Sequence, residues 1–153
     1  MHRQTGLDTP AFPPDRPAPT EGRYHQPGEP WPLYASLEPV TAWAEWSAAT
    51  RGAIDPASER RRLWRLKANV LPVVDLRRPG VAAELEVNLD DLTGARSRAA
   101  HALAARARGA GAQGMIVPSA AQAGAWNLIV FPDGFSRVKA AGSRAMNPRP
   151  PAT

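Results

Sequence analysis

The sequence predicts an α+β domain built on a small curved or split sheet that is flanked by helices. Several short runs have the alternating or uniformly apolar character of strands, whereas only two segments have the length and limits of helices. The 153 residues suit a single hydrophobic core rather than two independent ones. We therefore expect one domain over residues 1–145 and a flexible tail over 146–153, where prolines crowd the terminus.

The segment from residue 8 to residue 32 is expected to be an irregular loop within this domain. Its prolines stand at positions 10, 13, 14, 17, 19, 27, 30 and 32, a density at which neither a helix nor a central strand persists. The segment lies between Arg3 and a later group of polar and aromatic residues, so we expect it to wrap over a binding site. The next run, Leu33 to Ala35, predicts a short apolar strand.

A mostly buried helix is expected over Val40 to Thr50. Its side chains are apolar at nearly every position, and Pro39 and Gly52 mark its limits. Glu45 is the only charged residue in this run. Because a lone carboxylate is costly to bury without a partner, Glu45 must either reach solvent at the rim of the helix or face a polar cavity.

Two strands are expected after this helix. Residues 62–70 alternate apolar and polar side chains with period two, which indicates a strand with one solvent-facing side. Residues 73–76 predict a second short strand that ends in a turn at 77–80. Residues 84–88 are weakly strand-like.

An alanine-rich helix is expected over Ser97 to Arg108, with glycines directly after it. Its apolar stripe at helical spacing consists of Ala100, Leu103, Ala104 and Ala107. Two buried strands follow at 115–117 and 127–131. After a turn signature at 132–134, residues 135–138 are expected to return as a hairpin partner.

Composition limits the chemistry and the surroundings of the chain. It contains no cysteine, which excludes disulfides and cysteine-ligated zinc and fits a reducing compartment. No segment approaches the roughly 20 apolar residues that span a bilayer, so we expect a soluble cytoplasmic protein without membrane contact. The net charge is +5, and of 19 basic residues only Lys67 and Lys139 are lysines. This surplus suits an acidic partner, but the arginine bias runs through the whole chain and decides little by itself.

The strongest functional pattern consists of Arg23, Tyr34 and Glu45, which follow one another at intervals of eleven residues. A guanidinium holds a diphosphate, an aromatic ring attracts a flat cationic ring, and a carboxylate stabilises positive charge that develops on a ribose. The hypothesis is therefore a site that consumes NAD. Each residue also has a plainer explanation: a solvated surface arginine, a packed tyrosine and a glutamate at the rim of its helix.

Three further residues are candidates for hydrogen bonds to a ligand, namely Ser97, Ser119 and Asn127. Ser97 is equally suited to cap the helix that it opens, and the other two to anchor turns. His25 and His101 are too isolated in the sequence to indicate a metal site, so no metal is expected.

Six strings, in order over about residues 2 to 138, carry a family resemblance. They are His2-Arg3-Gln4-Thr5-Gly6, Gly22-Arg23-Tyr24-His25, Leu33-Tyr34-Ala35-Ser36, Glu45 in its helix, Val117-Pro118-Ser119-Ala120 and Asn127-Leu128-Ile129-Val130-Phe131. With these strings the chain resembles the RES-domain proteins, the toxins of bacterial RES–Xre toxin–antitoxin pairs. Tyr24 and His25 stand where that family usually has Trp and Asn.

The resemblance implies a fold like that of ADP-ribosyltransferases and an activity that degrades NAD, its substrate, by hydrolysis, phosphorolysis or ADP-ribosyl transfer. It implies that Arg3 and Arg23 bind the phosphates and ribose of NAD. It also implies that Tyr34 stacks on nicotinamide and that Glu45 supports cleavage of the glycosidic bond. The remaining ligand-binding positions that it implies are Ser97, Ser119 and Asn127.

An Xre-type antitoxin that covers the cleft is the partner implied by the resemblance. Direct contact with nucleic acid is not expected, and a homo-oligomer is left open. The alternative, which rests on composition, is a basic non-catalytic module that binds nucleic acid or an acidic protein. Such a module would lose affinity steeply as salt is added.

Overall fold

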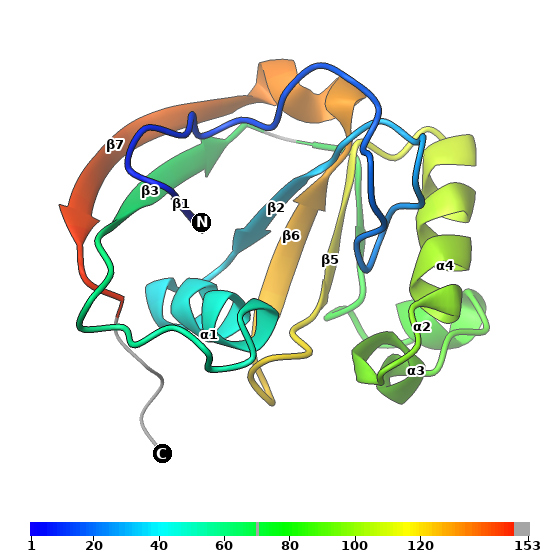
Figure 1. Ribbon diagram of the computed structural model, residues 1–153. Helices are drawn as coiled ribbons and strands as arrows, with labels where there is room; N and C mark the ends of the chain where they lie inside the picture. Colours follow the sequence, from blue (N-terminus) through cyan, green and yellow to red (C-terminus); the bar gives the residue numbers. More distant parts are fainter. Residues whose placement is uncertain (70, 149–153) are drawn as a thin grey trace.

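Seven strands form one mixed sheet in the order β4-β5-β6-β2-β1-β3-β7 (Figure 1). The structure is a computed structural model that describes residues 1–69 and 71–148. The strands are β1 (His2–Thr5), β2 (Leu33–Ser36), β3 (Arg61–Ala68), β4 (Val73–Asp75), β5 (Gly114–Pro118), β6 (Trp126–Val130) and β7 (Val138–Met146). The helices are α1 (Pro39–Ala49), α2 (Val81–Glu84), α3 (Leu89–Thr93), α4 (Arg98–Gly109) and the 3₁₀ helix η1 (Pro132–Arg137). The predicted α+β class is confirmed.

The sheet is split between β1 and β2. Strand β1 pairs with β3 along all of its residues, from His2 to Thr5, but it pairs with β2 only where His2 lies opposite Ser36. The two strands therefore diverge, and an opening is left beside their unpaired backbone. The sheet also curves strongly towards β3 and β7 (Figure 1). The curved or split sheet that the sequence predicts is thus present.

Two helices lie on one face of the sheet and define where a site can form. Helix α1 packs against β1 and β2, whereas α4, together with the short α2 and α3, covers the β5 side (Figure 1). The buried residues of α4 are the predicted stripe: Ala100, Leu103, Ala104 and Ala107. They pack in one core cluster with Met115, Val117 and Ile129 of the sheet.

Alternation along β2 distributes its side chains between the two faces of the sheet. Leu33 and Ala35 belong to a second core cluster on the face away from α1 and α4. Because neighbouring residues of a strand point to opposite faces, Tyr34 and Ser36 project on the face that carries the helices. This places two polar side chains beside the split.

Two predicted elements differ in the structure. Residues 84–88 are not a strand: α2 ends at Glu84, and the backbone N–H of Val87 donates to the carbonyl of Ala82 in a turn. Residues 135–137 belong to η1, so the predicted hairpin partner at 135–138 is wrong. The chain becomes a strand only at Val138, and β7 pairs with β3 instead of β6.

The proline-rich segment is irregular, as predicted. Between β1 and β2 its backbone makes two isolated bridges, Pro17 to Pro30 and Gly22 to His25. At the other end of the chain, β7 continues through Met146, which lies opposite Arg61. The amide of Asn147 then donates to three carbonyls of the loop at 56–59. Strand β7 and the contacts of Asn147 thus reach into the stretch predicted as a tail, of which residues 149–153 lie outside the described residues.

Candidate active site

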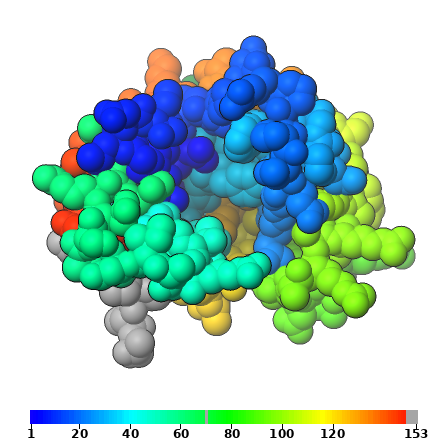
Figure 2. All heavy atoms as spheres, viewed as in Figure 1, coloured from blue at the N-terminus to red at the C-terminus, as the bar shows by residue number. Residues whose placement is uncertain are grey.

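A cavity of about 270 Å³ lies where the split in the sheet meets α1. Its lining comes from β1, β2, α1 and the beginning of β6: His2, Arg3, Gln4, Tyr34, Ala35, Ser36, Ala42, Glu45, Ala49 and Asn127. In Figure 2 the hollow opens between the N-terminal strand, the proline-rich segment and α1. The volume is at the lower end for small-molecule pockets, so it suits one part of a larger ligand.

Helix α1 brings its single carboxylate to this cavity. Ala42, Glu45 and Ala49 are spaced by three and four residues, which places them on one face of a helix. Trp43 and Trp46, next to this face, are both buried. Small alanines flank Glu45, so its side chain reaches the cavity without obstruction.

Two neutral donors hold the Glu45 carboxylate. The Ser119 hydroxyl donates to Oε1 at 2.7 Å, and the Asn127 amide donates to the same oxygen at 2.6 Å. Among the described residues both bonds end on Oε1, which leaves Oε2 for a ligand. Charge-assisted hydrogen bonds of this kind fix a carboxylate without neutralising it. Glu45 is therefore an oriented anion at the wall of the cavity.

Ser119 and Asn127 are themselves fixed by further hydrogen bonds. The Ser119 hydroxyl accepts from the backbone N–H groups of Ala121 and Gln122, both at 3.1 Å. The side-chain oxygen of Asn127, Oδ1, accepts a hydrogen bond from the Ser36 hydroxyl at 2.8 Å. Ser119 is buried behind the carboxylate, outside the cavity lining. Its contacts position Glu45, whereas Asn127 both positions Glu45 and lines the cavity.

Sequence reasoning did not single out Ser36 or the second contact between α1 and the β5–β6 turn. Thr41, fully buried, donates to the side-chain oxygen of Gln122 at 2.8 Å. Strand alternation was the available signal for Ser36, because it lies two residues beyond Tyr34 and so on the same face. The Thr41–Gln122 contact joins residues 81 positions apart and had no sequence signal.

Arg3 brings a cation to the other wall of the cavity. Its Nη1 donates to the Tyr34 carbonyl at 3.0 Å across the split. Its Nε is shielded from solvent and has no hydrogen-bond partner within residues 1–69 and 71–148. Burial lowers the pKa of Arg3 to about 10, so the group still carries its charge at neutral pH. A desolvated guanidinium with a free donor favours an anionic ligand.

Tyr34 lines the cavity with its hydroxyl directed away from it. The hydroxyl contacts His25 Nδ1 at 2.8 Å and accepts from the Tyr24 backbone N–H at 3.0 Å. Desolvation raises the pKa of the Tyr34 phenol, so the group is neutral. What Tyr34 offers to the cavity is its ring.

Arg23 and Ser97 lie outside this cavity. Arg23 Nη1 donates to the carbonyls of Leu92 and Gly94, at 3.1 and 2.8 Å, and so ties the proline-rich segment to the end of α3. Ser97 precedes α4 without a side-chain cap and lines a separate open hollow with Arg96. Of the predicted site residues, the structure brings together Arg3, Tyr34, Glu45, Ser119 and Asn127.

No cluster of three or more His, Cys, Asp or Glu side chains that could hold a metal ion occurs in the part of the chain that the structure describes. None of its helices has the length and apolar character needed to cross a bilayer.

The chain was compared with known proteins. It is 35% identical over 135 residues to a protein of Mycobacterium tuberculosis (strain ATCC 25618 / H37Rv) named probable NAD(+) phosphorylase, over 88% of this chain and 65% of the relative. The chain thus spans just under two thirds of that relative's length.

The structure also matches a chain in the crystal structure of the M. tuberculosis MbcT-MbcA toxin-antitoxin complex, with a TM-score of 0.79. The match covers 96% of this chain and 83% of that chain at 23% identity, which establishes a common fold. The RES domain family model matches residues 2–149, nearly the whole chain. By this match, the chain belongs to the RES domain family.

Proposed function

We propose that this chain binds NAD in the cavity and cleaves the bond between nicotinamide and ribose. The observation that carries the proposal is that an oriented carboxylate, Glu45, faces the guanidinium of Arg3 across one small cavity, and that the buried Nε of Arg3 has no partner among the described residues. NAD presents an anionic diphosphate and a cationic nicotinamide ring. The two side chains match these two charges.

Arg3 supports binding of the diphosphate or of the adjoining ribose. Its buried Nε lacks a partner among the described residues, and an anionic oxygen placed there would recover the cost of that desolvation. The cavity holds about 270 Å³, so we assign it the nicotinamide riboside half of NAD. The adenosine half then extends out of the mouth.

Glu45 supports the bond cleavage. The bond between ribose C1 and the pyridinium nitrogen breaks, its electron pair goes to that nitrogen, and nicotinamide leaves as a neutral molecule. Positive charge develops on the ribose, and a carboxylate held in advance by Ser119 and Asn127 stabilises it without reorganising. The ring of Tyr34 offers a π surface to the cationic nicotinamide before cleavage.

Hydrogen phosphate is the acceptor that we propose, on the strength of the relative named probable NAD(+) phosphorylase. One phosphate oxygen bonds to ribose C1, and the proton of the hydrogen phosphate leaves to solvent. The products are nicotinamide and a phosphorylated ADP-ribose. Water in place of phosphate would give hydrolysis.

The same proposal covers the biological setting. We propose that the chain is the toxin of a toxin–antitoxin pair, acts on NAD in the cytoplasm, and is held inactive by an Xre-type antitoxin that closes the cavity. The fold shared with a chain of the MbcT-MbcA complex supports an antitoxin partner. Arg23 and Ser97 remain predicted contacts, and Arg23 reaches the diphosphate only by giving up its two carbonyl partners.

The proposal is tested by incubating purified protein with NAD, with and without phosphate, and measuring free nicotinamide and the ribose product. We expect nicotinamide release that depends on phosphate. Glu45→Gln keeps the shape of the side chain and should reduce release at least about 100-fold. Glu84→Gln, which removes the same charge from an exposed site on α2, is the matched control.

Absence of nicotinamide release by folded, antitoxin-free protein, with or without phosphate, would overturn the proposal. Salt-sensitive binding to nucleic acid that Glu45→Gln leaves unchanged would then favour the basic binding module instead.

A further inference from the structure

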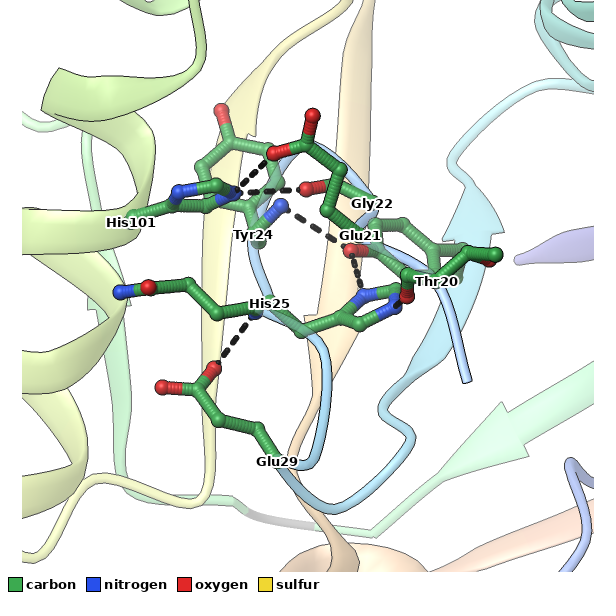
Figure 3. A network of polar contacts seen from close by, with 9 residues as sticks. Thr20, Glu21, Gly22, Tyr24, His25, Glu29 and His101 are labelled. Atoms are coloured by element: carbon green, nitrogen blue, oxygen red, sulfur yellow. Dashed lines mark hydrogen bonds and ion pairs between the residues drawn. The ribbon is translucent and has the colours of Figure 1, made fainter. Parts of the chain in front are cut away.

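Thr20, Gly22, Tyr24 and His25 of the proline-rich segment lie close together (Figure 3), and the Tyr34 hydroxyl contacts this group. His25 Nε2 lies 3.0 Å from the carbonyl oxygen of Thr20, and His25 Nδ1 lies 2.8 Å from the Tyr34 hydroxyl. A carbonyl oxygen only accepts hydrogen bonds, so Nε2 carries the proton. Burial lowers the pKa of His25, so the ring is neutral at pH 7 and carries only this one proton. His25 Nδ1 is therefore the acceptor, and the Tyr34 hydroxyl donates to it.

The Tyr34 hydroxyl also acts as a hydrogen-bond acceptor. Its oxygen accepts from the backbone N–H of Tyr24 at 3.0 Å. One donor and one acceptor contact fix the position of the hydroxyl oxygen, and with it the axis of the side chain. Because a phenolic O–H prefers to lie in the plane of its ring, the hydrogen bond donated to His25 also favours one orientation of that plane. We call Thr20, Gly22, Tyr24 and His25 the tyrosine seat.

Gly22 shows how closely the seat fits. A Cβ added at Gly22 would lie 2.6 Å from His25 Nδ1 and 2.8 Å from the Tyr34 hydroxyl oxygen, so no larger residue fits without moving the pair. The backbone N–H of Gly22 donates to the His25 carbonyl at 3.0 Å. These contacts leave no free space between the seat and the ring.

Helix α4 anchors the seat from the other side. His101 Nε2 lies 2.8 Å from the carbonyl oxygen of Gly22, to which it donates. His25 itself is buried, at 5% exposed, and its ring lies 5.7 Å from that of Tyr34 between centroids. A histidine inside such a network is built to hold another group, since neither of its nitrogens faces the cavity.

We propose that His25 is a positioning residue of the cavity, which accepts a hydrogen bond from the Tyr34 hydroxyl and thereby sets the tyrosine ring at the angle that a nicotinamide ring requires. This inference deepens the proposed function and rests on it for the identity of the ligand. His25 never touches the substrate in this assignment. It acts on binding, through Tyr34, and leaves the chemistry at Glu45 unchanged.

The test compares two substitutions of similar shape. In His25→Asn the Oδ1 atom takes the place of Nδ1 and accepts from Tyr34, whereas His25→Leu fills the same space with no acceptor. We expect His25→Leu to raise the KM for NAD about tenfold, the cost of one buried hydrogen bond, with kcat within about twofold. His25→Asn should restore most of the lost affinity. Thermal unfolding of both variants checks that they are folded.

A second arm needs no turnover of NAD. Nitrogen-15 NMR of the imidazole should show His25 as the neutral Nε2–H tautomer, and the Tyr34 ring should flip more slowly in the wild type and in His25→Asn than in His25→Leu. If the wild type does not cleave NAD, the proposed function fails, but the NMR measurements still test whether His25 holds the Tyr34 ring in place. The inference is overturned by an Nδ1–H tautomer, by equal ring dynamics in all three proteins, or by a His25→Leu variant that loses kcat at unchanged KM.

Discussion

Two arginines of the same predicted role occupy opposite environments in this molecule. Arg3, beside the split of the sheet, has one carbonyl partner and a buried Nε without any partner among the described residues. Arg23, at the end of α3, gives two hydrogen bonds to the carbonyls of Leu92 and Gly94. An arginine's capacity for a ligand therefore depends on which of its donors the fold leaves without a partner, and of these two arginines Arg3 retains more of that capacity.

The two hollows of the molecule, one beside Arg3 and one next to α4, also differ. Around Arg3 lies an organised cavity in which Ser119 and Asn127 hold a carboxylate by short hydrogen bonds. The hollow next to α4 is lined by Arg96, Ser97 and Arg98 and is open to solvent. Glu21 lines this second hollow as well, so both hollows hold charges of both signs. The difference is that hydrogen bonds hold the Glu45 carboxylate in place, and this favours the cavity beside Arg3 for the proposed chemistry.

The largest expected difference is the effect of removing Arg3. Arg3→Gln should reduce kcat/KM for NAD about 100-fold, because a charged hydrogen bond to the diphosphate is lost from a desolvated site. The melting temperature should change little, since the wild-type guanidinium is poorly paired. Steady-state kinetics and calorimetry measure the two quantities, with the exposed Arg78→Gln as control. Full activity in Arg3→Gln would remove the basis for a diphosphate site here.

Arg23→Gln should show the reverse pattern. Two carbonyl partners are left without their donor, so we expect the free energy of unfolding to fall by about 2 kcal/mol. We expect kcat/KM to change less than fivefold when it is measured well below the melting temperature. Denaturant unfolding gives the first value. A loss of activity as large as that in Arg3→Gln would mean that Arg23 leaves its carbonyls when NAD binds.

A smaller effect is expected behind the carboxylate. Ser119→Ala removes the donor to Glu45 and the acceptor for two backbone N–H groups. We expect kcat to fall about tenfold, because Glu45 keeps Asn127 and loses only part of its support. Rescue of kcat in Ser119→Thr, which retains the hydroxyl, would assign the loss to that hydrogen bond. An unchanged kcat in Ser119→Ala would show that Asn127 alone orients the carboxylate.

The smallest effect concerns pH. Burial holds the pKa of His25 below its ordinary value of 6.5, against the hydrogen bond to the Thr20 carbonyl and the charge of Glu29, which raise it; His101 and Arg108 lower it further. The neutral histidine therefore stabilises the fold above pH 6.5, and this contribution is lost as the pH falls from 6.5 through the lower folded pKa. Since the pKa of His2 is also lowered by burial, the measurement is the difference between wild type and His25→Asn in unfolding between pH 7 and 5. Identical pH dependence of the two proteins would contradict the assignment.

Much of the framework could be predicted because it depends on local pattern. The stripe of α4, the limits of α1 and the apolar strands β5 and β6 follow from helical spacing, Pro39 and uniform burial. Strand β7 could not be predicted, because its Ala, Gly and Ser residues have little strand preference and its pairing with β3 joins distant segments.

The site was predictable in composition but not in arrangement. The sequence indicated a cation, a ring and a carboxylate, and the structure gathers Arg3, Tyr34 and Glu45 around one cavity. The sequence could not indicate that Arg23 is engaged elsewhere, because the carbonyl partners of Arg23 lie about 70 residues away along the chain. Nor could it indicate the part of His25, whose contact with Tyr34 requires the fold of the proline-rich segment.

Strand β7 has a consequence for how copies of the protein meet. It forms one border of the sheet, so a row of its backbone groups faces outward where another molecule's strand could add. Lys139 and Arg144 are exposed along it, and Ala141 is an extra residue that interrupts its register with β3. Charge repulsion and an irregular contour both oppose border-to-border stacking. Strand β7, which the sequence did not predict, thus has features that oppose aggregation through its exposed edge.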